Sequence, residues 1–231
     1  MTGQRLRAAR EQKGWKQEEA ALRMGVSQAY LSLLESSKRR VPGKLAARAV
    51  RVYGLSNALL PLGATSDQIT PSDEDTLASD LAAMGYPGFS YLRSRRKKKN
   101  PAELLLSALN TSDLDSRIIE ALPWVVLTFP DLDWQWLING AKVKDLQNRL
   151  GFITGVARRL AEQRGEHEKA ALLASEEVRL ERSRLLREDT LCHDSLTQAE
   201  RRWLRKNRPR EAAHWRLLTD LAPEQLNHAN S

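Results

Sequence analysis

The spacing of apolar residues constrains the fold of this 231-residue chain more than any other feature of its sequence. Apolar side chains recur mainly three and four positions apart, which is the repeat of a helix with one buried face. β-branched residues seldom alternate with polar ones, so strand signals are almost absent. With 41% hydrophobic and 29% charged residues, the chain has enough apolar surface for a buried core. The sequence therefore predicts an all-α globular protein.

Turn and capping residues divide the N-terminal stretch, residues 1–61, into five short helices. Glycines are expected to end the first, second and fourth helices, because glycine adopts the left-handed conformation that follows a helix. Three further residues suit helix starts: an N-cap for the third helix, a first-turn proline for the fourth and an N-cap for the fifth. In chain order these six residues are Gly14, Gly25, Ser27, Pro42, Gly54 and Asn57.

A domain boundary is expected after residue 62. Residues 63–76 are small, polar and acidic, and 63–99 is predicted to be a linker with a short helix and a basic run. The second domain is predicted to span 100–231, and Asn100, Pro101 and Glu103 occupy the N-cap, N1 and N3 positions of its first helix.

The longest helical pattern of the second domain runs from Lys142 to Gln163, where apolar residues form one continuous seam. Gly165 is expected to separate it from another helix that ends near Arg187, giving an antiparallel helical hairpin. A final pair of helices is predicted to start at Thr197, where Glu200 completes a capping box, and to resume after proline 209.

The positive charge of the chain is concentrated at its N-terminus. The formal net charge is +8, and residues 1–62 account for all of it with 12 basic and 4 acidic side chains, whereas 63–231 holds 25 of each. A local surplus of positive charge favours a polyanionic partner, either nucleic acid or an acidic membrane surface.

Two helices joined by a short glycine-containing turn occupy the centre of this basic stretch. The first begins at Gln17, Gly25 and Val26 form the turn, and the second follows at once. Leu31 and Leu34 continue a buried face, so Gln28, Ala29 and Ser32 are expected to lie on the opposite side of the helix. This arrangement is a helix-turn-helix, in which the second helix enters the major groove of DNA.

The N-terminal sequence resembles the Cro/C1 family of helix-turn-helix regulators, also called the XRE family. The matching stretch, from about Gly3 to Leu60, includes LRAAREQKGWKQEEAALRMGVSQAYLSLLE and then VPGKLAARAVRVYGLSNALL. The resemblance implies that Gln17 binds a phosphate and that Gln28 and Ala29 face the bases. It also implies a partly buried ion pair between Arg10 and Glu35.

Elementary chemistry gives further residues roles on DNA. A glutamine amide offers a paired donor and acceptor to adenine, so Gln28 is the first choice for a base reader. Ala29 offers only apolar contact, and Tyr30 can stack, reach a phosphate or contact a thymine methyl. The basic loop that follows is expected to bind backbone phosphates. The complete predicted DNA interface is Gln17, Ser27, Gln28, Ala29, Tyr30, Ser32, Lys38, Arg39 and Arg40.

A second basic run has two interpretations. A solvated loop is the simpler one, and a second contact to nucleic-acid backbone is the alternative. The run consists of Arg93, Arg95, Arg96, Lys97, Lys98 and Lys99.

Three other patterns in the second domain are best explained by structural roles. Trp124, Trp134 and Trp136 are expected to fill a core rather than a ligand pocket. The aspartates 113, 115, 131 and 133 are expected to cap helices. Cys192 adjoins a histidine and an aspartate, but neighbours in sequence rarely converge on one reacting atom.

Several function classes lack a sequence signal. The histidines show no metal-ligand spacing, there is no phosphate-binding glycine loop, and we predict no metal, no cofactor and no enzymatic activity. The single cysteine fits a reducing compartment. No signal peptide or membrane span is evident, so the expected location is cytoplasmic, on the bacterial nucleoid when bound to DNA.

These observations lead to three function hypotheses. The first is a sequence-specific transcriptional regulator, an autorepressor that binds its double-stranded DNA operator as a homodimer through the 142–163 seam or the tryptophan-rich segment. The second is an antitoxin that also binds a toxin through 100–231, because residues 108–152 resemble the extension of XRE regulators paired with nucleotidyltransferase-type toxins. The third is a regulator that senses a small ligand in a helical pocket.

Overall fold

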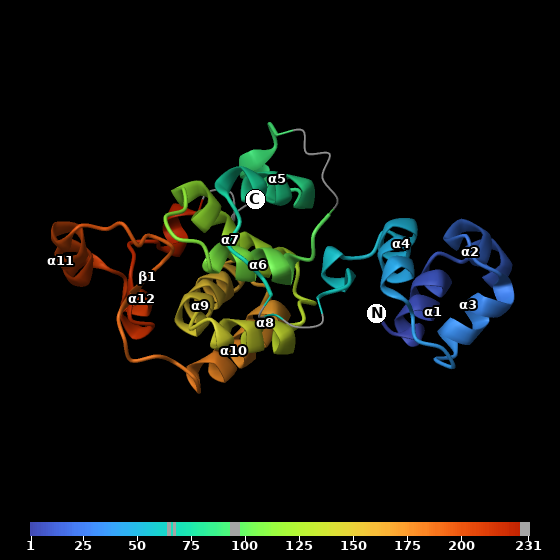
Figure 1. Cartoon of the computed structure of the whole chain (residues 1–231). Coiled ribbons are helices and arrows are strands. Elements are labelled where there is room, and N and C mark those ends of the chain that lie inside the picture. Colours follow the sequence, from blue (N-terminus) through green and yellow to red (C-terminus); the bar gives the residue numbers. More distant parts are fainter. Residues whose placement is uncertain (64–65, 67, 93–97, 227–231) are drawn as a thin grey trace. The chain divides into compact units, whose positions relative to one another are not determined.

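A computed structural model describes residues 1–63, 66, 68–92 and 98–226, which belong to two compact units, Met1–Leu62 and Gly63–Ser231 (Figure 1). Helices make up nearly all of the regular structure, so the prediction of an all-α protein is confirmed. Over the described ranges, the one extended pairing joins β1 (Asp189–Thr190) in parallel to β2 (Leu217–Leu218). No helix in these ranges is long and apolar enough to cross a membrane.

The first unit contains four α-helices and a short 3-10 helix. They are α1 (Gly3–Gln12), α2 (Gln17–Met24), α3 (Gln28–Glu35), α4 (Gly43–Tyr53) and η1 (Asn57–Leu59). The predicted fifth helix is thus a single 3-10 turn. Its N-cap is Ser56, whose hydroxyl accepts from the backbone N–H of Ala58 at 3.2 Å, whereas Asn57 is buried inside the turn. The assignment of Asn57 as the cap was therefore wrong by one residue.

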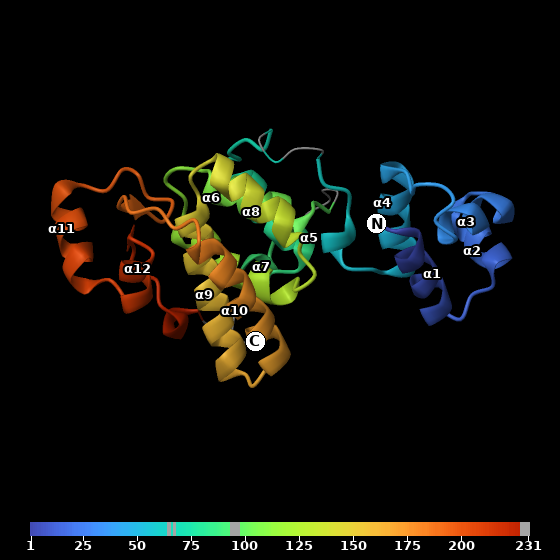
Figure 2. The same ribbon diagram turned by 90° about the horizontal axis from the view of Figure 1, so that it is seen from below.

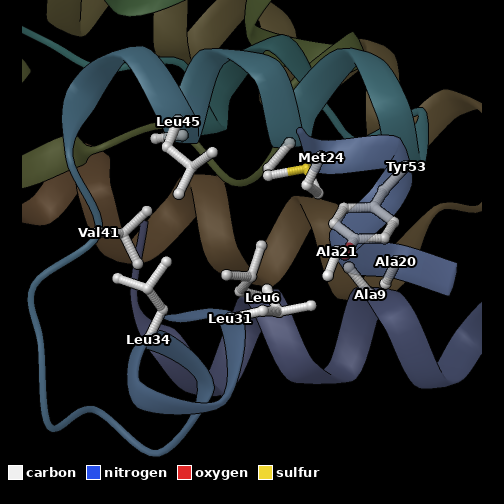
Figure 3. Close-up of a cluster of buried hydrophobic side chains, with 12 residues drawn as sticks. Leu6, Ala9, Ala20, Ala21, Met24, Leu31, Leu34, Val41, Leu45 and Tyr53 are labelled. Carbon is white, nitrogen blue, oxygen red and sulfur yellow. The ribbon is translucent and has the colours of Figure 1, made fainter. Parts of the chain in front are cut away.

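The core of the first unit draws on all four α-helices. Leu6, Met24, Leu31 and Tyr53 meet at its centre and are almost completely buried (Figure 3). Leu34 continues the buried face of α3, as its spacing from Leu31 predicted. Packing therefore fixes the rotation of α3 and leaves the residues on its other face free for contact with a partner.

The turn between α2 and α3 follows the predicted chemistry. Gly25 ends α2 with φ +60°, a left-handed conformation that costs glycine little. Ser27 then caps α3, since its hydroxyl accepts from the backbone N–H of Tyr30 at 3.2 Å. The two helices are thereby held in a helix-turn-helix arrangement.

Over the described ranges, the second unit contains seven helices of nine or more residues, together with short elements near its C-terminus. In chain order its elements are α5 (Glu74–Met84), η2 (Pro87–Phe89), α6 (Pro101–Leu109), α7 (Ser116–Thr128), α8 (Trp134–Val143), α9 (Gln147–Gln163), α10 (His167–Glu181), β1, α11 (Gln198–Asn207), α12 (Arg210–His214), β2 and η3 (Pro223–Gln225). The predicted capping box is present at the start of α11, where Thr197 and Glu200 bond reciprocally.

Helix α5 belongs to the second unit rather than to a linker. Its Leu77 and Leu81 are fully buried, and the hydroxyl of Ser72, just before the helix, lies 2.7 Å from that of Ser107 on α6. The predicted linker over 63–99 is therefore partly folded into the domain that follows it. This segment resembled a linker because it is acidic and because α5 buries only a narrow apolar stripe.

The predicted helix over Lys142–Gln163 is broken near its start. Helix α8 ends at Val143, Asp145 adopts φ +57°, and α9 begins only at Gln147. The expected antiparallel hairpin is present, because α9 and α10 lie side by side after a turn at Gly165 (Figures 1 and 2). The apolar spacing continued across the break and concealed it.

Most residues of the surfaces proposed for dimerisation are inside the fold, although Val143 of the seam is 68% exposed. Leu150, Ile153 and Leu160 of the predicted seam are fully buried between helices of one chain. Trp124 and Trp134 of the tryptophan-rich segment are buried as well, as core packing predicted, whereas Trp136 is only half-buried. The buried residues of these two segments are therefore not available for a contact between chains.

A buried arginine connects α9 to segments about 40 residues away on either side. The guanidinium of Arg149 donates to both carboxylate oxygens of Asp189, at 2.8 and 3.0 Å, and to the carbonyl of Leu109 at 2.9 Å. It also reaches Asp194 at 3.3 Å. A buried charge stabilises a fold only when it is paired and hydrogen-bonded, and Arg149 meets both conditions.

Candidate nucleic-acid interface

The outward face of α3 presents a small set of side chains. Gln28 and Ala29 are exposed in its first turn, and Ser32 is half-buried one turn later. Leu33 is 37% exposed, so this apolar side chain also lies at the surface. The structure therefore places Gln28, Ala29 and Ser32 together on one face of α3.

The predicted ion pair between Arg10 and Glu35 is present beneath this face. The guanidinium of Arg10 donates to both oxygens of Glu35, at 2.8 and 3.0 Å, and to the carbonyl of Trp15 at 2.9 Å. Only 2% of the Glu35 side chain is exposed. The hydrogen bonds from Arg10 to Glu35 raise the pKa of the guanidinium above its ordinary value. This pair fixes the end of α3 against α1.

Two glutamines extend this ion pair toward the surface. Gln17 donates its amide N–H to Glu35 at 2.9 Å, and Gln28 donates its own to the amide oxygen of Gln17 at 2.9 Å. The outer amide is thus linked through Gln17 to a buried carboxylate. A side chain held in this way loses less conformational freedom when it binds a partner.

The basic loop after α3 is exposed along its whole length. Lys38, Arg39 and Arg40 are all at the surface, and the guanidinium of Arg39 lies 5.9 Å from the centre of the Tyr30 ring. Tyr30 itself is half-buried against the core of the first unit. Its ring therefore has a packing role in addition to any contact with DNA.

Two cations of the first unit support the motif in ways that sequence patterns did not predict. Arg48 on α4 donates to the carbonyl of Met24 at 2.8 Å and so satisfies the C-terminus of α2. Arg23 lies 4.2 Å from the ring centre of Trp15, in a cation–π contact. Neither partnership has a local sequence signal, because each joins segments brought together only by folding.

The second basic run is only partly described. Arg93, Arg95, Arg96 and Lys97 lie outside the described residues. Lys98 is exposed, whereas the ammonium of Lys99 lies 3.9 Å from the carboxylate of the buried Asp80. Lys99 therefore has a partner inside its own unit.

The other residues singled out in the second domain have structural contacts. Asp115 and Asp133 cap α7 and α8, and Asp113 accepts from the backbone N–H of Ser195 at 2.8 Å. Cys192 is fully buried, and burial raises the pKa of its thiol to about 12. The carboxylate of Asp194 accepts from the hydroxyl of Thr190 at 2.8 Å.

Two findings concern ligand sites in the second unit. Over the described ranges, no group of three or more His, Cys, Asp or Glu residues is placed to hold a metal ion. A cavity of about 520 Å³ lies between α7, the loop after β1, α11 and the segment after β2. Sequence reasoning missed it because its walls come from four separate segments, none of which has a motif.

Comparison with known proteins assigns the class of the first unit. Residues 3–62 match the family model described as a helix-turn-helix domain. The first unit is therefore a helix-turn-helix domain, a fold that supports a DNA-binding regulator. The match covers the stretch that resembles the Cro/C1 family and is consistent with that type. Neither the curated proteins nor the solved structures yielded a match to this chain.

Proposed function

We propose that this protein is a Cro/C1-type repressor that binds an operator in double-stranded DNA as a homodimer and represses its own gene. The observation that supports this most strongly is the hydrogen-bonded series from Arg10 through Glu35 and Gln17 to Gln28. It holds a glutamine at the exposed start of the helix that enters the major groove in such domains.

The geometry of Gln28 suits an adenine. A side-chain amide has two N–H donors and one acceptor oxygen, and the bond to Gln17 uses a single donor. The second N–H and the oxygen are left for N7 and the N6 amino group of adenine. The hydroxyl of Ser32 can donate a hydrogen bond to a base or accept one from it, and Ala29 can contact a thymine methyl.

The exposed basic loop supplies the complementary positioning contacts. Phosphate contacts fix the orientation of a protein on the duplex but hold little sequence information. Lys38, Arg39 and Arg40 therefore act with Gln17 to hold α3 in the groove, while Gln28 discriminates between bases. One such domain reads only a short half-site, which is why we include dimerisation in the proposal.

Two alternatives concern the second unit. An antitoxin would bind a toxin encoded beside its gene, and the sequence resemblance of residues 108–152 supports that role. A ligand-sensing regulator would use the cavity near α11. Copurification of a stoichiometric protein partner would favour the antitoxin. We propose no enzymatic activity, and the buried, protonated thiol of Cys192 supports this view.

The test of the proposal is to sequence the genomic DNA fragments that the purified protein retains. We expect a site with two half-sites upstream of its own gene. Retention of random fragments, with no enriched motif, would contradict operator binding. Enrichment of a single half-site would contradict dimeric binding but not operator binding.

Replacement of the predicted base reader tests the mechanism. Gln28→Ala is expected to reduce discrimination at one base pair by about 5- to 150-fold, the equivalent of about 1 to 3 kcal/mol. Affinities for the operator and for operators mismatched at each position measure the effect. Gln12→Ala is the matched control, because Gln12 is also exposed but lies at the end of α1. If Gln28→Ala retains the preferences of the parent protein, Gln28 is not the base reader.

A further inference from the structure

The cavity of the second unit has a strongly apolar floor. Ile119, Leu191, Leu204 and Leu218 line it and are buried. Its volume of about 520 Å³ is within the range of sites that hold small molecules, about 300 to 1,000 Å³. Four separate segments form its walls, so the shape of the cavity depends on the complete fold of this unit.

Half of the polar side chains of the lining are acidic. Glu120, Glu200 and Asp220 contribute three carboxylates, His193 adds an imidazole, and no Lys or Arg is among the lining residues. Arg201 is the next residue on α11, but its guanidinium donates to the carbonyls of Asp194 and Leu196, at 3.0 and 3.1 Å. The cavity is thus locally acidic in a chain whose net charge is +8.

These carboxylates are available for a ligand. Over the described ranges, Glu120, Glu200 and Asp220 form no ion pair with Lys or Arg. One oxygen of Glu200 accepts from both the backbone N–H and the hydroxyl of Thr197, each at 2.7 Å, and these bonds lower the pKa of its carboxyl. Its negative charge is therefore retained at neutral pH, and its other oxygen has no bond within the described chain.

An exposed tryptophan completes the site. Trp203 lines the cavity and is 55% exposed, although tryptophan usually buries most of its surface. The indole face is the best aromatic partner for a cation, and nearby carboxylates add to that attraction. An apolar floor, an indole and three carboxylates together match one ligand chemistry.

We propose that this cavity binds a small organic cation, an ammonium group on an aromatic or aliphatic body. The apolar body lies on Ile119, Leu204 and Leu218, and the ammonium lies between the Trp203 indole and the carboxylates of Glu120 and Asp220. The site goes beyond operator binding. Only its use as an effector site, which would couple the cation to DNA affinity, rests on the proposed function.

The experiment is calorimetric titration of the full-length chain without DNA. Three cations serve as probes: tryptamine, hexylamine and phenyltrimethylammonium. Tryptophol and indole-3-propionate are the neutral and anionic matches of tryptamine. We expect at least one cation to bind with a Kd below about 1 mM. Tryptophol is expected to bind at least about tenfold more weakly than tryptamine, and indole-3-propionate is expected not to bind. Failure of all three cations at that concentration, or equal binding of tryptophol, would overturn the proposal.

Variants locate the binding. Trp203→Ala and the double variant Glu120→Gln/Asp220→Asn are each expected to weaken the cation by about 3- to 30-fold, in keeping with cation–π and exposed charge contacts. Glu168→Gln, an exposed carboxylate on α10, is the matched control and is expected to bind as the parent does. Unchanged binding in both cavity variants would place the cation elsewhere and overturn the site.

A separate measurement distinguishes the two proposals. Operator affinity is determined with and without the tightest cation. If the cation binds but no operator is found, the proposed function fails and the ligand site stands. If the operator binds and no cation does, only the ligand site fails.

Discussion

Cys192 is the only cysteine of the chain, so its chemistry can be followed without interference. The side chain is fully buried, and its Sγ lies 3.5 Å from the carbonyl of Ala108. We expect a thiol reagent at pH 8 to modify the folded protein very slowly and the unfolded protein at once. With a reagent that releases a chromophore when it reacts with a thiol, absorbance measures the rates for the folded and the unfolded protein. Equal rates in buffer and in denaturant would contradict burial of the thiol.

The same thiol predicts a pH dependence of stability. Its pKa is about 12 in the folded protein and about 8.5 in an unfolded chain, so folding favours the protonated form. The stability that this preference contributes is complete below pH 8.5 and is lost as the pH rises toward 12. Between pH 8 and 10, the difference in unfolding free energy between the parent and Cys192→Ala should fall by about 1 to 2 kcal/mol. Urea titrations at both pH values measure it.

The sequence predicted which residues have functional or structural roles better than it predicted their side-chain contacts. The pairing of Arg10 with Glu35 followed from the family resemblance, and the structure contains it. The bond from Gln17 to Glu35 and the contact of Arg48 with Met24 did not follow, because each depends on a side-chain direction set by packing. The left-handed conformation of Ser37, at φ +58°, has no signal in the sequence either.

Among the elements, helix starts were more predictable than helix interiors. Ser27, Asn100 and Thr197 cap α3, α6 and α11 as their sequences indicated. The break before α9 was missed because apolar spacing is the same on both sides of it. Pro123 lies inside α7, although a proline in a helix interior removes a backbone hydrogen bond. Local residue preferences therefore do not predict that α7 continues through this position.

Helix α9 contains two glycines that provide a matched pair of substitutions. A methyl group on Gly151 would lie 2.6 Å from Cζ2 of the buried Trp215, whereas one on Gly155 would meet only the carboxylate end of Glu177 at 3.0 Å. Gly151→Ala should lower the unfolding free energy by about 1 to 3 kcal/mol, although alanine favours a helix. Gly155→Ala should change it by less than about 1 kcal/mol.

Thermal or urea unfolding of both variants measures this contrast. A Gly151→Ala protein as stable as the parent would show that Trp215 can move away from α9 at little cost. The expected contrast depends on how α9 packs, because Trp215 approaches α9 from a segment more than 60 positions away in the sequence.

On the scale of the whole molecule, charge separates the two units. Residues 1–62 have a net charge of +8, and residues 63–231 have none. DNA affinity should therefore decrease steeply with salt, because each phosphate contact releases a counterion and contributes about 0.9 to the logarithmic slope. Replacing Lys38, Arg39 and Arg40 with alanine should reduce the slope by about 3.

A second triple variant provides the control. Lys142, Arg182 and Lys206 are exposed cations of the second unit, and their replacement with alanine removes the same charge from the chain. Binding titrations over a range of salt concentrations compare the two. An equal reduction in slope for both triples would mean that overall charge, rather than the loop after α3, sets the salt dependence.

The Arg149 contacts have a consequence for biosynthesis. The arginine leaves the ribosome about 40 residues before Asp189 and Asp194, the carboxylates that neutralise it. Until then, α9 cannot be buried without an unpaired cation, so packing of the second unit must await synthesis of the last quarter of the chain. A message truncated before codon 189 would yield a product that retains the DNA-binding unit but lacks a stable second one, and cellular proteases would be expected to remove that part.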